Sequence, residues 1–107
     1  ISGLGYNYSV TKHEGQVELY IDRGKDMDAE NKLIFDKLLS HKDEIEQVFG
    51  EPLNWEHLEG RRACRISKKI AIGGYRDDKW PAIHEAMIDA MIRLEKALKP
   101  HISRLKL

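Results

Sequence analysis

The run VELYID at residues 17–22 alternates apolar and polar side chains, and the fold can be worked out from it in both directions. Its apolar positions are Val17, Leu19 and Ile21, and its polar positions are Glu18, Tyr20 and Asp22. Successive side chains of an extended chain point to opposite faces, so this run predicts a β-strand with one buried and one solvated face. A similar alternation over residues 6–11 precedes it, separated by a short segment that contains Gly15. Two such runs around a short turn predict an antiparallel hairpin.

Downstream of this hairpin, apolar residues follow helical rather than strand spacing: Ile34, Phe35, Leu38, Leu39, Ile45, Val48 and Phe49. This spacing predicts one continuous helix of about 20 residues, from near Asp28 to Phe49. Asp26 or Asp28 is the expected N-cap. Gly50 suits the left-handed residue that follows a helix, and Pro52 prevents its continuation.

A second hairpin is predicted in the next part of the chain. Apolar or aromatic residues alternate with polar ones at Leu53, Trp55 and His57, and the next strand has its apolar face at Cys64, Ile66, Ile70 and Ile72. Glu59–Gly60 is the expected turn between them. Lys68 falls in phase with the apolar face, so we expect a bulge or a strand end near Lys68–Lys69.

A second amphipathic helix follows this hairpin. Its apolar positions are Ile83, Met87, Ala90, Met91, Leu94 and Leu98. Their intervals place them on one face of a helix. Asp77 or Asp78 is the expected cap, and Pro100 is the expected end.

These elements predict a single α+β domain over residues 1–107, in the order ββαββα, with two helices packed on one face of a four-stranded antiparallel sheet. The chain is 41% hydrophobic and 34% charged, a composition typical of a globular domain. It starts at Ile1 without a methionine, so we expect a C-terminal piece of a longer protein. No apolar run approaches the length of about 18 residues that a membrane crossing requires. Cys64 is the single cysteine, which favours a reducing, cytoplasmic location.

Charge is segregated along the chain although the formal net charge is zero. Residues 26–51 contain eight acidic residues and three lysines, whereas residues 61–76 contain six basic residues and no acidic one. The basic residues are Arg61, Arg62, Arg65, Lys68, Lys69 and Arg76. Arg61, Arg65 and Lys69 share strand parity, so we expect them to project from the open face of the sheet.

Such a stripe is suited to phosphate contacts, with Arg62, Lys68 and Arg76 in support and Tyr20 available to stack on a base. The competing interpretation is internal cross-strand pairing. The acids on the same polar face are Glu18, Asp22 and Glu56.

No catalytic residue, cofactor or metal site is expected from the remaining residues. The five histidines are scattered without metal-ligand spacing, at His13, His41, His57, His84 and His101. Glu30-Asn31-Lys32 has the letters of a nuclease motif but falls at a helix start rather than on a strand. Cys64 is in phase with core isoleucines and is expected to be an inert buried thiol. Trp55 and Trp80 are expected to be core and capping anchors.

Several short segments together resemble a prokaryotic family, the domain of unknown function 4268. They are Glu18–Gly24, Phe35–Leu38, Lys42–Glu46, Gly50–Trp55, Arg62–Ile66 and Asp78–Pro81. Members of that family look like C-terminal modules of larger proteins, several of which are nuclease-like or associated with restriction and defence. The resemblance carries no catalytic residues over to this chain.

The leading functional hypothesis is therefore a non-catalytic accessory domain that helps a nuclease-like or restriction-associated parent protein bind DNA. Its expected contacts are Arg61, Arg65 and Lys69. The alternative is a protein-interaction or homodimerisation module without a role in nucleic-acid binding. In that case the open sheet face, or a ridge formed by Ile88 and Ile92, would contact a second copy or the N-terminal part of the parent chain.

Overall fold

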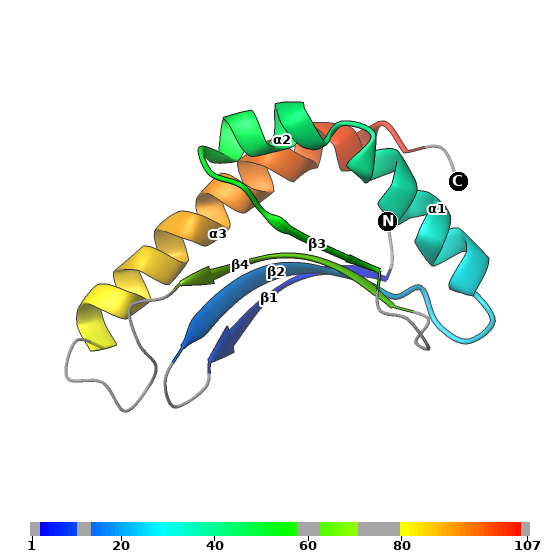
Figure 1. Ribbon diagram of the computed structural model, residues 1–107. Coiled ribbons are helices and arrows are strands. Elements are labelled where there is room, and N and C mark those ends of the chain that lie inside the picture. Colours follow the sequence, from blue (N-terminus) through cyan, green and yellow to red (C-terminus); the bar gives the residue numbers. More distant parts are fainter. Residues whose placement is uncertain (1–2, 11–13, 58–62, 71–79, 106–107) are drawn as a thin grey trace.

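The computed structural model describes residues 3–10, 14–57, 63–70 and 80–105. Its elements in chain order are β1 (Leu4–Val10), β2 (Gly15–Ile21), α1 (Asp28–Leu39), α2 (Lys42–Phe49), β3 (Asn54–His57), β4 (Cys64–Ile70) and α3 (Trp80–Ser103). The strands form one antiparallel sheet in the order β1-β2-β4-β3. All three helices lie on the same side of this sheet, which bends away from them (Figure 1). The predicted α+β class and the four-stranded antiparallel sheet are confirmed.

The core lies between the helices and the two central strands, β2 and β4. The strands contribute Val17, Leu19, Ile21, Cys64 and Ile66, all of them fully buried. The largest fully buried apolar side chains of the helices are Ile34, Leu38, Ile45, Phe49, Ile83, Leu94 and Leu98. These buried positions follow the alternation along β2 and the helical spacing along α3, as the sequence predicts. No helix of the described residues covers the opposite face of the sheet, which is called the open face below.

The described residues form three helices, so the expectation of one continuous helix to Phe49 is wrong. The break lies at Ser40 and His41, between α1 and α2. The Ser40 hydroxyl donates a hydrogen bond to the Lys37 carbonyl oxygen at 2.6 Å. The His41 N–H bonds to the Leu38 carbonyl oxygen, and His41 adopts φ −110° and ψ 22°. A serine that bonds to the backbone competes with helix propagation, and here it allows α2 to turn toward α3.

Two expected helix boundaries are also wrong. Met27, rather than Asp26 or Asp28, occupies the N-cap of α1 and makes no side-chain cap bond. Asp28 lies in the first turn, where its negative charge interacts favourably with the positive end of the helix dipole. Pro100 does not end α3, which runs on to Ser103. Within the last turn, a proline removes only one hydrogen bond, and the Ser103 hydroxyl donates to the Pro100 carbonyl oxygen at 2.9 Å.

The sequence predicts a bulge or a strand end near Lys68–Lys69; the described pairing has no bulge there, and β4 is described as far as Ile70. Lys68 lies opposite Val17 and Lys69 opposite Gln16 in an unbroken register. Lys68 therefore does point to the helix side, at the strand end. Its Nζ atom lies 3.4 Å from the Pro52 carbonyl oxygen and 3.8 Å from a Glu51 carboxylate oxygen.

Two glycines occupy positions of the fold that other residues could not take without strain. Gly50 ends α2 in the left-handed conformation, with φ 99°, as expected. Gly15 begins β2 directly beneath α3, where an added Cβ would lie 2.7 Å from the Met87 sulfur. Other expected features, the turn at Glu59–Gly60, the cap at Asp77 or Asp78 and residue Ile72, lie outside the described residues.

Candidate functional site

The open face is the surface on which the sequence places the anion-binding residues. Its side chains come from alternate positions of the four strands: Gly5, Asn7 and Ser9 on β1, Gln16, Glu18 and Tyr20 on β2, Arg65, Ser67 and Lys69 on β4, and Asn54 and Glu56 on β3. The described part of the face thus mixes amides, hydroxyls and both signs of charge.

Arg65 lies at the middle of this face and is paired within the chain. Its Nε and Nη2 atoms donate hydrogen bonds to Glu56 Oε2 at 2.9 and 2.6 Å. Its Nη1 atom lies 3.6 Å from Glu18 Oε2. The hydrogen bond to Glu56 is the main cause that raises the pKa of Arg65 above its ordinary value. Two carboxylates largely neutralise this guanidinium and occupy its N–H donors, so it attracts a phosphate only weakly.

The other predicted contacts are placed differently from Arg65. Lys69 also lies on the open face, 58% exposed, and its Nζ atom is 4.0 Å from a Glu14 carboxylate oxygen. Tyr20 is half-buried between Gly5 and Arg65 in the strand register. Lys68 points to the opposite side of the sheet, so it is not part of this surface. Arg61, Arg62 and Arg76 lie outside the described residues. The structure thus brings Tyr20, Arg65 and Lys69 onto one face.

The outer edge of the sheet is a second candidate surface, formed by β1. This strand is seven residues long and contains no charged residue and no proline. Its Tyr8 side chain is 52% exposed, and Val10 is also exposed. The opposite edge strand, β3, has four residues and carries Glu56. Natural sheets protect their edges by short strands, charges or prolines, so β1 is the less protected of the two edges.

The flank of α3 that faces β1 extends this surface. A groove of about 280 Å³ separates the two elements and is lined by Leu4, Tyr6, Glu95, Lys99 and Ile102. Ile88 and Ile92 continue the same helix flank toward the start of α3, and Ile92 is 62% exposed. Burial is the main cause that raises the pKa of Tyr6 to about 12, so its hydroxyl remains a neutral donor at physiological pH. The edge and this flank together are called the β1–α3 surface.

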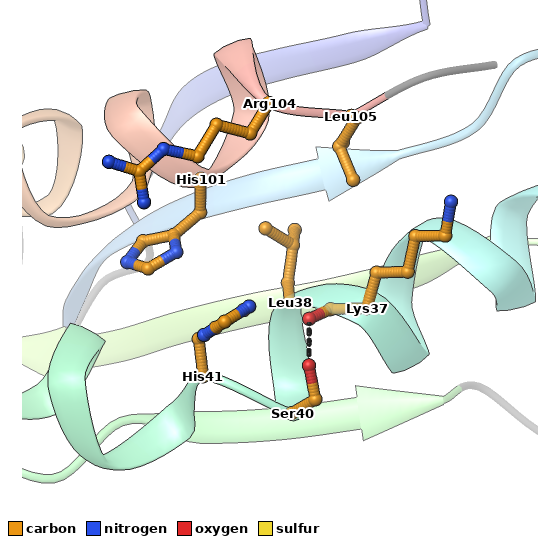
Figure 2. A pocket seen from close by; sticks show the side chains of 7 residues that line it. All are labelled: Lys37, Leu38, Ser40, His41, His101, Arg104 and Leu105. Carbon is orange, nitrogen blue, oxygen red and sulfur yellow. Dashed lines mark hydrogen bonds between the residues drawn. The ribbon is translucent and has the colours of Figure 1, made fainter.

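The structure also joins two histidines that the sequence leaves apart. His41, in the turn between α1 and α2, and His101, near the end of α3, have ring centroids 4.7 Å apart (Figure 2). Both rings line a pocket of about 150 Å³ that Leu38, Ser40 and Leu105 help to form. Neither histidine has metal-ligand spacing, and only the break after α1 and the continuation of α3 through Pro100 bring them together.

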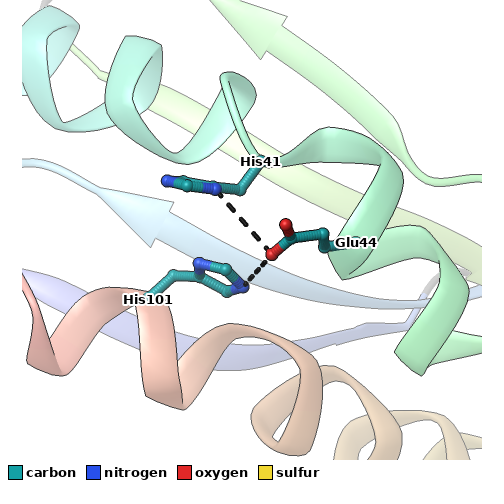
Figure 3. A group of neighbouring side chains, drawn as sticks. All are labelled: His41, Glu44 and His101. Atoms are coloured by element: carbon teal, nitrogen blue, oxygen red, sulfur yellow. Dashed lines mark ion pairs between the residues drawn. The ribbon is translucent and has the colours of Figure 1, made fainter.

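Glu44 lies beside both rings. Its Oε2 atom is 3.9 Å from His41 Nδ1 and 3.9 Å from His101 Nε2 (Figure 3). The His101 side chain is only 10% exposed, whereas His41 and Glu44 are 50% and 70% exposed. Burial is the main cause that lowers the pKa of His101 below its ordinary value, and the neighbouring charge of His41 adds to it. Both effects favour the neutral form of His101.

Cys64 is placed as the sequence predicts. The side chain is fully buried, and burial is the main cause that raises the pKa of its thiol to about 11. Trp55 packs edge-on against Phe35, with ring centroids 6.2 Å apart, and its indole N–H donates to Glu46. Cys64 and Trp55 therefore contribute to the core rather than to a functional site. The expectation for Trp80 stays a prediction, because its side chain lies outside the described part of the chain.

The fold defines a small domain of the α+β class, with a four-stranded antiparallel sheet covered on one face by helices. Comparison with known families then places the chain. It belongs to the family described as Domain of unknown function (DUF4268), whose model matches residues 1–102. No curated protein and no solved structure matched the chain. Within the described ranges, none of the helices has both the length and the apolar character needed to cross a bilayer.

Proposed function

We propose that this domain is a non-catalytic protein-interaction module that pairs with a second copy of itself through the β1–α3 surface. The observation that carries the proposal is the long, uncharged and exposed edge strand β1. An unpaired strand edge presents N–H and C=O groups that an added strand can bind. The new strand would extend the sheet from four strands in one copy to a continuous sheet across two.

The direction of the β1 backbone groups supports this pairing. The Asp22 N–H donates to the Gly3 carbonyl oxygen at 2.8 Å, and these two residues lie opposite each other when the register is extended by one position. In an antiparallel ladder, hydrogen-bonded and non-hydrogen-bonded pairs alternate. The backbone groups of every second residue therefore point away from β2: Leu4, Tyr6, Tyr8 and Val10.

The spacing of these outward residues is symmetric about Asn7. In an antiparallel β1–β1 pair centred on Asn7, Tyr6 lies opposite the partner's Tyr8, and Leu4 opposite the partner's Val10. Every outward-pointing residue then meets another one, and no like charges are brought together because β1 carries none. This self-complementarity favours a second copy over an unrelated partner.

The flank of α3 is also self-complementary under the two-fold rotation that relates the two β1 strands. Tyr6 lies next to Asn7 and lines the groove with Glu95 and Lys99, so a two-fold axis at Asn7 passes close to these two residues. Rotation about that axis brings Glu95 of one copy toward the oppositely charged lysine of the other. Ile92 is brought in the same way toward the apolar end of the groove.

The test is the oligomeric state of the chain over a concentration range from about 1 to 100 µM, where weak and moderate interfaces dissociate. Sedimentation is measured for the wild type, Tyr8→Lys and Tyr8→Pro. The Tyr8 N–H points outward, so a proline there leaves the β1–β2 ladder intact. Dimeric wild type and monomeric variants support the proposal. Asn54→Lys, which adds the same charge to the β3 edge, should remain dimeric. A monomeric wild type, or a dimer unaffected by Tyr8→Lys, overturns it.

DNA binding through the open face is a second proposal, made for a domain that serves a nuclease-like or restriction-associated parent chain in the cytoplasm. The observation in its favour is Lys69, which is exposed at the end of β4 with its nearest carboxylate oxygen at the limit of an ion pair. The acid-free run of residues 61–76 also contains Arg61, Arg62 and Arg76. The pairing of Arg65 with Glu56 and Glu18 weighs against a large contribution from Arg65.

A further inference from the structure

We propose that His41, Glu44 and His101 form a binding site for a divalent transition-metal ion of the zinc type. The three residues come from the α1–α2 turn, the first turn of α2 and the last part of α3, and their side chains converge from two sides (Figure 3). Their candidate ligand atoms all lie within 4.8 Å of one another.

The donor set selects the class of metal. Two imidazoles and one carboxylate are the protein ligands of many zinc sites that keep a fourth position for water. Nitrogen donors disfavour Mg²⁺ and Ca²⁺, which prefer all-oxygen coordination. Water would take the fourth position.

The distances are close to what coordination needs. Tetrahedral zinc with bonds near 2 Å holds its ligand atoms about 3.3 Å apart. The Glu44 oxygen lies 3.9 Å from each histidine nitrogen, so each of these two contacts must close by roughly 0.6 Å to coordinate zinc. The two histidine nitrogens lie within 4.8 Å of each other and must close by up to about 1.5 Å. His41 and Glu44 are exposed and can make this adjustment by side-chain rotation, while the buried His101 supplies the fixed ligand.

The nearby positive charges set the expected strength of binding. Lys37 lines the same pocket, but its ammonium group points away from the two rings (Figure 2). Arg104 is close enough to His101 to contribute to its electrostatic environment. Arg104 therefore opposes a bound cation, and removing its charge should strengthen binding.

Binding would also connect two parts of the fold. His41 and Glu44 belong to the α1–α2 region and His101 to the last turns of α3, so a shared ion would fix α2 against the C-terminal part of α3. An ion that binds the folded chain more tightly than the unfolded chain raises the temperature of unfolding.

The test uses the full chain, freed of any affinity tag and of metal by a chelator, titrated calorimetrically with Zn²⁺. We expect one ion per chain, with affinity weakened about tenfold or more in His41→Gln, His101→Gln and Glu44→Gln. His84→Gln, which removes a histidine elsewhere on α3, should bind like the wild type, and Arg104→Gln should bind more tightly. Tyr8→Lys should bind equally well, which separates this site from the dimer surface.

Co²⁺ provides a second measurement, because its visible spectrum reports coordination directly. A tetrahedral spectrum in the wild type that is lost in His41→Gln supports the proposal. His41 is exposed, so this variant should remain folded even if His101→Gln does not. Absence of Zn²⁺ binding by the wild type, or undiminished binding by His41→Gln, overturns the proposal.

Discussion

The guanidinium of Arg65 donates two hydrogen bonds to Glu56 from the neighbouring strand, at 2.9 and 2.6 Å. Glu18, on the strand at the other side, lies 3.6 Å from the same guanidinium. Arg65 thus bridges β2 and β3 across the open face. This pairing makes the role of Arg65 primarily cross-strand cohesion, and it makes the DNA-binding proposal testable through Glu56.

Glu56→Gln should increase DNA affinity if the open face contacts phosphates. The substitution removes one negative charge and weakens the hold on Arg65. The slope of log affinity against log salt concentration should then steepen by about 0.9, the value for one additional phosphate contact. The measurement is a salt titration of binding to a short duplex, followed by fluorescence anisotropy.

Glu85→Gln provides the matched control, because it makes the same charge change on the exposed part of α3. An Arg61→Ala/Arg65→Ala/Lys69→Ala variant completes the set and should lose affinity. If neither the triple variant nor Glu56→Gln changes binding relative to Glu85→Gln, the open face is not a DNA surface.

A charge reversal at Lys99 should weaken the proposed dimer. Lys99→Glu places an acid opposite Glu95 of the other copy, and like charges across an interface reduce association. The double variant Glu95→Lys/Lys99→Glu restores opposite charges and should recover the dimer. Sedimentation of both variants at low salt measures the effect.

Lys96→Glu makes the same charge change on the solvent side of α3 and should leave association unchanged. A dimer that responds equally to Lys96→Glu and Lys99→Glu would indicate a general charge effect. The proposed two-fold axis near Asn7 would then be wrong.

Most of the fold could be predicted from the segments in which apolar residues recur with strand or helix periodicity. Val17, Leu19 and Ile21 are all fully buried, and so are Ile83 and Leu94 of the α3 stripe. These positions are predictable because burial of one face is the main driving force for each element. The strand order was not predictable, since local alternation shows which residues share a face but not that β2 pairs with β4.

The candidate metal site depends on two local departures from the sequence rules. The Ser40 hydroxyl ends α1 early and places His41 in the following turn. Helix α3 continues through Pro100, which places His101 on the helix and against His41. Each departure depends on one or two hydrogen bonds and tertiary packing, which outweigh intrinsic propensity. Spacing along the chain could not reveal a site made by both.

Glu46→Ala should destabilise the fold, because this carboxylate ties α2 to the following strand. Its Oε2 atom accepts hydrogen bonds from the Leu53 N–H at 2.7 Å and from the Trp55 indole N–H at 3.2 Å. Loss of two hydrogen bonds to a charged acceptor should lower the free energy of unfolding by about 2 kcal/mol. Urea denaturation of the variant measures this change.

Glu46→Gln retains a carbonyl oxygen and should lose about half as much, which distinguishes hydrogen bonding from side-chain packing. Gln47→Ala changes the exposed neighbouring position and should remain near the wild-type stability. Equal losses in Glu46→Ala and Gln47→Ala would show that the effect is not specific to the Glu46 carboxylate.

The Cys64 thiol should make the stability of the domain fall at alkaline pH. Burial raises its pKa in the folded chain to about 11 from an ordinary value of 9.0, so the unfolded chain loses the proton first. As pH rises from 9.0 toward about 11, ionisation stabilises the unfolded state, and the free energy of unfolding decreases. Cys64→Ala should show a smaller decrease over this window, measured by urea denaturation at several pH values. The raised pKa of Tyr6, about 12 in the folded chain against an ordinary 10.0, also lowers stability at alkaline pH, but it does so equally in both proteins and cancels in the comparison. The same burial should protect the wild-type thiol from alkylation until urea unfolds the chain. Rapid alkylation of the folded protein at pH 8, or identical pH profiles for the two proteins, would contradict the buried, protonated thiol.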